Sequence, residues 1–180
     1  SLTAARARAA ERLRHAMKPL SAALALAAVK DPSVIDDAIE LVGSRGFGDQ
    51  QLDKLAHELV RLRYETDHLE MEALQRRLLA NGVTPEDLKR VEREAGRAGV
   101  AAPFLQASGE QARLLWRQAF DLLMQLEALE RAVETALQDV TRDPSALNTL
   151  GPLKTERDHL RRLLNSDWTK DDGGGTVLPH

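Results

Sequence analysis

The chain has 180 residues, of which 43% are hydrophobic but only 3% aromatic, and it contains no cysteine. The lack of cysteine excludes disulfides, thiolate metal ligands and a cysteine nucleophile, and no apolar run approaches the ~18 residues of a membrane-spanning helix. The net charge of −3 argues against a protein that coats nucleic acid with its whole surface, although residues 1–18 hold five basic side chains against one acidic side chain, or +4.

Composition and periodicity favour an all-α fold. Leucine, alanine, glutamate and arginine dominate the chain, and these residues have high helix propensity. Residues that prefer strands are scarce, and no alternating run is long enough to indicate a strand. We therefore predict a multi-helix globular bundle over 19–125, followed by a long helix and a projecting C-terminal helical hairpin over 126–166.

The first elements are predicted from proline and glycine positions. Residues 1–18 read as a basic helical lead-in, and Pro19 begins a buried helix that continues to residue 29. Asp31-Pro32-Ser33 ends that helix and begins another over 34–42, with Ser33 as its cap. The glycine-rich stretch 43–48 is expected to break this helix.

Capping signals place the next two helices. Asp49 is predicted to cap a helix over about 50–65, which has apolar residues at helical spacing along one face. Asp67 and Glu70 have the spacing of a capping box for a helix that continues to Ala80. Asn81-Gly82 then ends that helix, because glycine tolerates the left-handed conformation of a C-cap.

A further cap precedes the longest helix. The segment 84–87, Thr-Pro-Glu-Asp, is a strong N-terminal signal for a helix to about Arg97. Residues 99–108 are predicted to form a loop, with Phe104 and Leu105 tucked against the core.

The long helix and its return form the predicted hairpin. Apolar residues recur at helical spacing at Ala112, Leu115, Trp116, Ala119, Phe120, Leu123, Leu126, Leu129, Val133, Leu137 and Val140. A helix of this extent is on the order of 45 Å long, which exceeds a compact domain of ~100 residues, so its second half must project. Asp143-Pro144 opens a final helix that Pro152 is expected to kink, and residues 167–180 read as a disordered tail.

No segment makes a convincing catalytic or metal site. The stretch 43–48 superficially resembles a phosphate loop, but it lies between helices and lacks the lysine and hydroxyl of that motif. His68 and Glu72 lie four residues apart and could share a metal ion, but two ligands do not make a site. We therefore expect no catalytic residue, no metal and no cofactor in this chain.

Three blocks in a particular order carry a resemblance to a known family. They are 55–70, 113–130 with the sequence WRQAFDLLMQLEALE, and 153–162 with the sequence LKTERDHLRR. In this order they resemble the C-terminal helicase-binding domain of bacterial replicative DNA primases of the DnaG type, and the alphaproteobacterial branch most closely. The resemblance covers about 20–168, and no single motif within it is diagnostic.

The resemblance implies a helical bundle and a hairpin that docks on the hexameric replicative DNA helicase of the DnaB type, in the cytoplasm at the replication fork. The family's zinc-binding and polymerase domains have no counterpart here, so the chain is expected to be a non-catalytic part of a primase. Carried onto this sequence, the helicase contact falls on Leu129, Val133, Leu137, Leu147, Leu150, Leu153, Arg157, Leu160, Arg161 and Leu164.

The same resemblance implies a weaker second contact. In some members the bundle binds the acidic C-terminal tail of the single-stranded DNA-binding protein through basic residues near the first helix, and Lys18 is the nearest match, with Lys30 nearby. The sequence leaves open whether a domain-swapped dimer forms through the hairpin.

Two alternatives remain open at this point. The hairpin leucines could be ordinary core residues, packed back on the bundle. The chain could instead be a helical nucleic-acid-binding or regulatory domain that uses its basic N-terminal helix, although strong direct nucleic-acid binding is not expected. Phosphate binding falls steeply with salt, whereas an apolar hairpin contact does not, so salt dependence separates these functions.

Overall fold

The computed structural model describes residues 2–14, 16–66 and 70–166, and every regular element in these ranges is helical. The all-α prediction is therefore confirmed. The α-helices are α1 (Leu2–Arg14), α2 (Pro19–Lys30), α3 (Ile39–Arg45), α4 (Asp53–Glu65), α5 (Met71–Ala80), α6 (Pro85–Gly96), α7 (Gly109–Val140) and α8 (Leu147–Leu164). Short 3-10 helices are η1 (Pro32–Ala38), η2 (Gln50–Leu52), η3 (Gly99–Ala101), η4 (Pro103–Leu105) and η5 (Pro144–Ala146). Within the described ranges, no helix is sufficiently long and apolar to cross a membrane.

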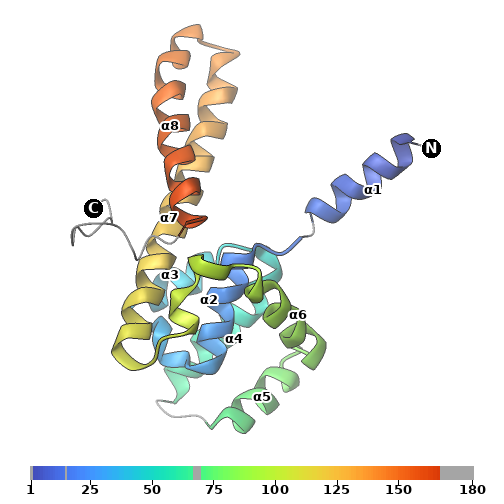
Figure 1. Cartoon of the computed structure of the whole chain (residues 1–180), viewed down its shortest axis with the longest axis vertical. Coiled ribbons are helices and arrows are strands. Elements are labelled where there is room, and N and C mark those ends of the chain that lie inside the picture. Colours follow the sequence, from blue (N-terminus) through green and yellow to red (C-terminus); the bar gives the residue numbers. More distant parts are fainter. Residues whose placement is uncertain (1, 15, 67–69, 167–180) are drawn as a thin grey trace.

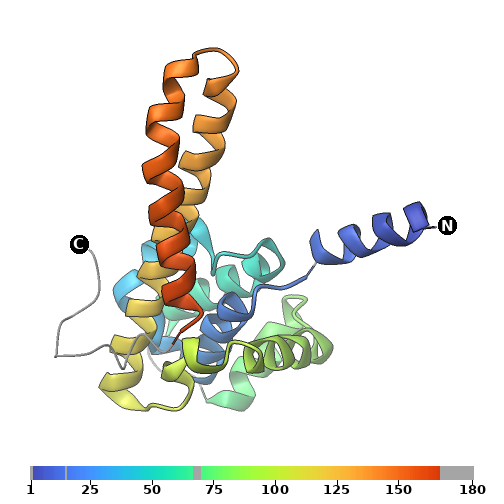
Figure 2. The same ribbon diagram turned by 45° about the horizontal axis from the view of Figure 1, so that its top comes forward.

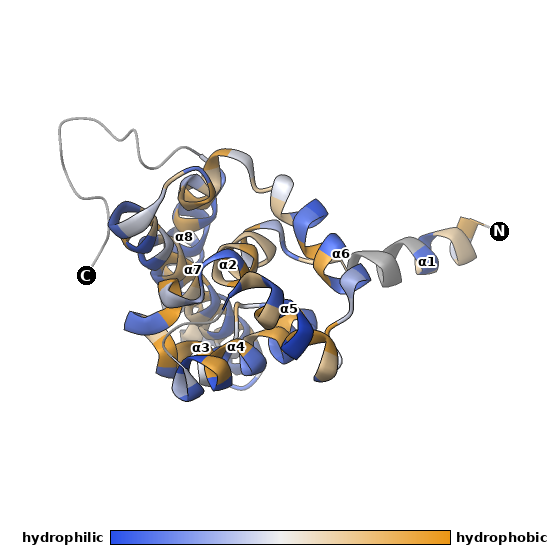
Figure 3. Cartoon of the chain, turned by 90° about the horizontal axis from the view of Figure 1, so that it is seen from below, coloured by the Kyte–Doolittle hydropathy of each residue, from blue (hydrophilic) through white to orange (hydrophobic). Residues whose placement is uncertain are grey.

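Helix α2 is the centre of the bundle. Its alanine-rich sequence is buried on almost every side, and small side chains let neighbouring helices approach closely. Seen from below in Figure 3, α2 lies among α3, α4, α5, α6 and α7, while α1 stands off to one side. The buried Trp116 of α7 donates a hydrogen bond of 2.9 Å from its indole Nε1 to the carbonyl oxygen of Leu24 in α2. Trp116 also stacks on Phe120 with ring centroids 5.1 Å apart.

The turn after α2 differs from the sequence prediction in its cap. Asp31, and not Ser33, caps the next element, because the Asp31 carboxylate accepts from the backbone N–H of Ser33 at 3.1 Å and from its hydroxyl at 2.6 Å. The predicted helix over 34–42 is divided into η1 and α3. Gly43 remains helical, and the chain leaves the helix only at Gly46, whose φ is +64°.

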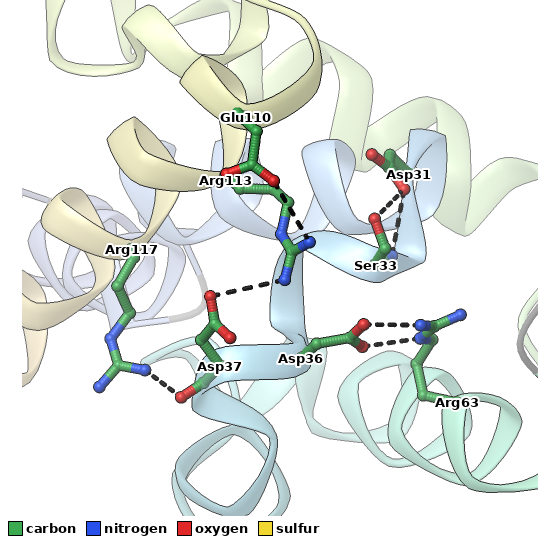
Figure 4. A network of polar contacts seen from close by, with 8 residues as sticks. All are labelled: Asp31, Ser33, Asp36, Asp37, Arg63, Glu110, Arg113 and Arg117. Carbon is green, nitrogen blue, oxygen red and sulfur yellow. Dashed lines mark hydrogen bonds and ion pairs between the residues drawn. The ribbon is translucent and has the colours of Figure 1, made fainter.

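A polar network explains why η1 is held in this form (Figure 4). The guanidinium of Arg63 in α4 binds both carboxylate oxygens of Asp36, with distances of 2.8 Å from Nε and 2.6 Å from Nη2. Arg113 of α7 lies 3.5 Å from the Asp37 carboxylate, and Arg117 donates to the Asp37 backbone carbonyl. These bonds tie η1 to α4 and α7, and such contacts between distant segments are invisible to local helix propensity.

Several predicted boundaries hold, and others shift. Asp49 accepts from the backbone N–H of Gln51 at 3.0 Å and therefore caps η2, as predicted. Helix α5 begins later than predicted, at Met71, and Glu70 makes no side-chain capping bond. Asp67 lies outside the described residues, as does the predicted disordered tail 167–180. Helix α8 runs through Pro152 without interruption, and the hydroxyl of Thr155 donates to the Gly151 carbonyl at 3.0 Å.

The hairpin projects from the bundle, as Figures 1 and 2 show. Helix α7 has 32 residues and is therefore about 48 Å long. Its first half packs against α2, η1 and η4, and its second half pairs with α8 outside the bundle. The expectation that α7 is too long for the bundle to cover is thus met in the fold.

The predicted cap of α6 is a complete capping box. The hydroxyl of Thr84 accepts from the backbone N–H of Asp87 at 3.2 Å, and the Asp87 carboxylate accepts from the backbone N–H of Thr84 at 2.8 Å. The Thr84 N–H and then its hydroxyl hold the pKa of the Asp87 carboxyl below its ordinary value of 3.8. The ionised carboxylate therefore favours the folded chain.

We predict that Asp87→Asn lowers the unfolding free energy by an amount that depends on pH. At neutral pH the variant should lose about 1 kcal/mol of unfolding free energy, as is usual for a lost cap. The pKa of Asp87 is lower in the folded chain than in the unfolded chain. The difference in unfolding free energy between variant and wild type should therefore persist above pH 3.8, and it should vanish as the pH falls through the folded-state pKa. Urea denaturation at several pH values measures this. A difference that does not change with pH would contradict the assignment.

Candidate functional site: the helical hairpin

The outer part of the hairpin has its own small apolar seam. Val133 and Ala136 of α7 are buried against Leu150 of α8, and Leu153 packs partly against them. This cluster is separate from the bundle core. It holds the two helices together beyond the bundle, so these side chains are engaged within the hairpin.

The base of the hairpin belongs to the bundle core. Leu160 and Leu164 of α8 are buried in the same cluster as Trp116 and Phe120, and Leu129 of α7 packs partly against it. The C-terminal half of α8 is therefore anchored on the bundle. The hairpin is attached through both of its helices.

A short loop lies against α7 where the helix leaves the bundle. We call residues 47–49 with Lys18 the collar. Gly48 has a φ of +84°, and a Cβ at that position would lie 2.8 Å from the Leu123 side chain and 2.9 Å from the Glu127 carboxylate. The Asp49 carboxylate accepts from the Lys18 backbone N–H at 2.9 Å. Sequence reasoning missed the collar, and its only local signal was the glycine-rich run.

Charged side chains flank the hairpin but contribute little to its stability. Arg161 pairs with Glu130 across the two helices at 3.1 Å, and Arg157 pairs with its neighbour Asp158 at 3.0 Å. Exposed ion pairs of this kind are each worth 1 kcal/mol or less, roughly. The apolar seam and the anchored base therefore dominate the pairing of α7 with α8.

The tip of the hairpin exposes two leucines beside an ordered turn. Leu137 is 47% exposed near the end of α7, and Leu147 is 57% exposed at the start of α8. Asp143 caps η5 by accepting from the backbone N–H of Ser145 at 3.0 Å and from its hydroxyl at 2.8 Å. The Ser145 hydroxyl and then its backbone N–H lower the pKa of the Asp143 carboxyl. The turn thus presents the two leucines in a defined conformation.

The residues predicted for helicase contact therefore fall into three groups. Buried are Val133, Leu150, Leu160 and Leu164; half-buried are Leu129, Leu153 and Arg157; exposed are Leu137, Leu147 and Arg161. A partner that meets the closed hairpin can reach the third group and the edges of the second. The buried group would reach a partner only if the hairpin opened, as in a domain swap.

The two lysines predicted to hold an acidic tail lie at opposite ends of α2. The Lys18 side chain is 53% exposed and lies 3.7 Å from the Glu127 carboxylate, next to a cavity of about 510 Å³. Lys30 is exposed at the far end of this helix of 12 residues, which places it about 18 Å away. The structure does not bring the two lysines together.

The sequence motifs considered for metal or phosphate binding gain no support. Within the described ranges there is no group of three or more histidine, aspartate or glutamate side chains that could hold a metal ion, and His68 lies outside them. In the stretch 43–48, a Cβ on Gly46 would lie 2.6 Å from the Asp53 carboxylate. An anionic side chain in that position repels phosphate.

Comparisons with protein-family models, curated proteins and solved structures found no match for this chain.

The collar yields a matched pair of glycine predictions. Gly48→Ala should cost at least about 1–2 kcal/mol, because an L-residue is strained at positive φ and the new methyl group meets Leu123. Gly96→Ala, at the end of α6 with nothing within 4 Å of the new methyl group and no positive φ, should instead leave the unfolding free energy unchanged or add up to about 0.5–1 kcal/mol through helix propensity. Urea denaturation followed by circular dichroism measures both. Equal stability of the two variants would show that the collar does not constrain α7.

A second pair tests which hairpin leucines are structural. Leu160→Ala should lower the unfolding free energy by about 2–5 kcal/mol, because it leaves a cavity in the bundle core. Leu147→Ala should change it by no more than about 0.5 kcal/mol, since its side chain is already exposed. Thermal and urea denaturation of both variants gives the comparison. A mild effect of Leu160→Ala would mean that the base of α8 is not anchored on the bundle.

Proposed function

We propose that this chain is a non-catalytic docking domain that binds the hexameric replicative DNA helicase through its hairpin. The protein that carries it would be a DNA primase, and docking would couple RNA primer synthesis to unwinding at the replication fork. The resemblance of three ordered sequence blocks to primase helicase-binding domains motivates the partner. The projecting hairpin, with Leu137 and Leu147 exposed at its tip, is the observation that supports docking.

The tip supplies the apolar contact in this proposal. Full burial of a leucine contributes about 1.5–3 kcal/mol, and an apolar centre with a polar rim is the usual anatomy of an interface. Thr141, Arg142 and Asp143 form the exposed polar turn beside them. A groove between helicase helices would receive such a tip as it receives an amphipathic helix.

The seam and the collar contribute by holding the tip in place. Binding costs free energy when side chains and loops must be ordered. The hairpin is already ordered by Val133 and Leu150 in its seam and by Leu160 at its base. Several such domains on one helicase ring would also raise the effective concentration of the attached polymerase, to the mM range with short flexible links.

The acidic tail of the single-stranded DNA-binding protein remains a second proposed partner. The cavity beside Lys18 is also lined by Arg45, which supplies a second cation, but the carboxylates of Asp49, Asp53 and Glu127 line it too and disfavour an acidic ligand. An acidic tail would have to displace Glu127 from Lys18, where the present distance is 3.7 Å. Lys30 is too distant from this cavity to contact the same short segment.

The decisive substitutions are at the tip. Leu137→Ala with Leu147→Ala should weaken binding to the replicative helicase of the same organism by at least about tenfold, or 1.4 kcal/mol, without lowering the thermal stability of the chain. Titration calorimetry, together with size-exclusion chromatography and light scattering, measures affinity and stoichiometry.

Leu114→Ala is the matched control for the tip variant. Leu114 lies on the same helix, is 60% exposed and belongs to the bundle end of α7. This control should bind the helicase like the wild type. If the tip variant binds as well as the wild type, the tip is not part of the interface. If the wild type does not bind, the helicase is not a partner of this chain.

A further inference from the structure

Helix α1 is separate from the rest of the molecule. Residues 2–8 are all exposed, with Leu2 at 72%, and Figures 1 and 2 show the helix standing clear of the bundle. It has 13 residues, a length at which an isolated helix is only marginally stable in water. A helix in this position gains stability when a partner of suitable chemistry lies against it.

The charge of the chain is divided between this helix and the body. Helix α1 carries +3, from four arginines and one glutamate, so the remainder of the chain carries −6 to reach the total of −3. The first turn of α1 has no acidic residue, and both Arg6 and Arg8 are exposed. The sequence places two more arginines, at positions 12 and 14, within the same helix. The partner that this charge fits is polyanionic.

A second row of cations lies on α6. Lys89, Arg93 and Arg97 are spaced four residues apart, so they share one face of the helix, and all three are exposed. The four acids of α6 match its cations in number: Asp87 is used in the capping box, Glu94 lies 3.4 Å from Arg97, and the exposed Glu86 and Glu92 each lie three residues from Lys89, beside the row. Successive cations in this row are about 6 Å apart along the axis.

The two basic elements occupy the same flank of the bundle. Met17, in the link between α1 and α2, lines a cavity of about 290 Å³ together with Asp87 and Arg90 of α6. In Figures 1 and 3, α1 leaves the bundle on the side that α6 forms, whereas the hairpin extends in another direction. A ligand on this flank therefore does not occupy the hairpin tip.

We propose that α1 binds the phosphate backbone of nucleic acid. Charge complementarity is the argument for this occupant, because the only strongly basic segment of an acidic chain is the one that stands clear of the body. This surface carries no aromatic residue on α1 or α6 for base stacking. Binding is therefore independent of base sequence and weak, with a Kd of about 10⁻⁴–10⁻⁶ M at physiological salt.

Such binding would not depend on the helicase contact. The proposal uses none of the hairpin residues, so it stands or falls separately from the proposed docking function. Its chemical signature is a steep dependence on salt, with log K falling by about 0.7 per log unit of salt for each phosphate contacted on a single strand. An apolar contact has no such dependence.

Fluorescence anisotropy with a labelled oligothymidylate of 30 nucleotides, titrated at several salt concentrations, tests the proposal. Arg6→Ala with Arg8→Ala should weaken binding about tenfold at low salt and reduce the salt slope by about 1.4, since two phosphate contacts are lost. Lys89→Ala with Arg93→Ala should have a smaller effect, because the exposed Glu86 and Glu92 lie beside these two cations. Alanine is the best helix former, so these exposed substitutions leave the helices intact, which circular dichroism verifies.

The matched control removes the same charge elsewhere. Arg131→Ala with Arg162→Ala changes two exposed cations on the hairpin and should reduce affinity by less than about twofold. A loss equal to that of the α1 variant would show attraction by net charge alone and would overturn the proposal. An interaction that does not depend on salt would also overturn the proposal. Tighter binding to polyglutamate than to the oligonucleotide would overturn it too, and would identify the partner as an acidic protein.

Discussion

One helix, α7, belongs to two hydrophobic cores at once. Its first half buries Trp116 and Phe120 against the bundle, and its second half buries Val133 against α8. An α-helix of 32 residues is stiff, so the packing of the first half sets the direction of the second. The hydrogen bond from Trp116 to the Leu24 carbonyl fixes the rotation of α7 on α2. The collar contacts α7 at Leu123 and Glu127, where the helix leaves the bundle.

This arrangement divides the hairpin leucines between stability and binding. The seam is small and remote, so the tip is the part of the hairpin expected to open most readily, while the base opens only with the bundle. Leu160 and Leu164 share the core of Trp116, and substitution there disturbs the whole domain. Leu137 and Leu147 are the two exposed leucines nearest the turn. A docking function assigned to the hairpin therefore depends on the tip, with the buried leucines supporting it.

Much of the fold could be predicted because its signals are local. Pro19 at the start of α2, the Thr84 capping box and the long apolar periodicity of α7 each depend on residues within a few turns of one another. The 3-10 form of η1 could not be predicted, because Arg63, Arg113 and Arg117 bind Asp36 and Asp37 from distant helices. The collar is missed for the same reason: Gly48 is required by the proximity of Leu123, a contact that no local pattern encodes. The cap at Asp31 is a local contact with Ser33, two residues away, and the sequence prediction assigned the cap to the wrong member of this pair.

The candidate site was predictable only in part, since periodicity shows that a face is apolar but not what covers it. The stripe from Leu129 to Val140 predicted a hairpin correctly, yet the same spacing describes Val133 in the seam and Leu137 in solvent. Charged residues can be assigned to the surface from the sequence alone, because charged groups remain at the surface whatever the fold. The basic N-terminal segment could thus be recognised from sequence, whereas its position beside α6 required the structure.

The separation of the two surfaces bears on how the domain would work. An apolar tip gives a contact that persists in salt, whereas a basic flank gives weak, fast and exchangeable contacts with a polyanion. Because α1 and α6 lie to the side of the hairpin axis, a strand held on the flank would run past the hairpin without blocking its tip. One domain could then remain docked through the hairpin while the strand slides along the flank, and the base formed by Leu160 and the collar would keep the hairpin in a constant direction from the bundle.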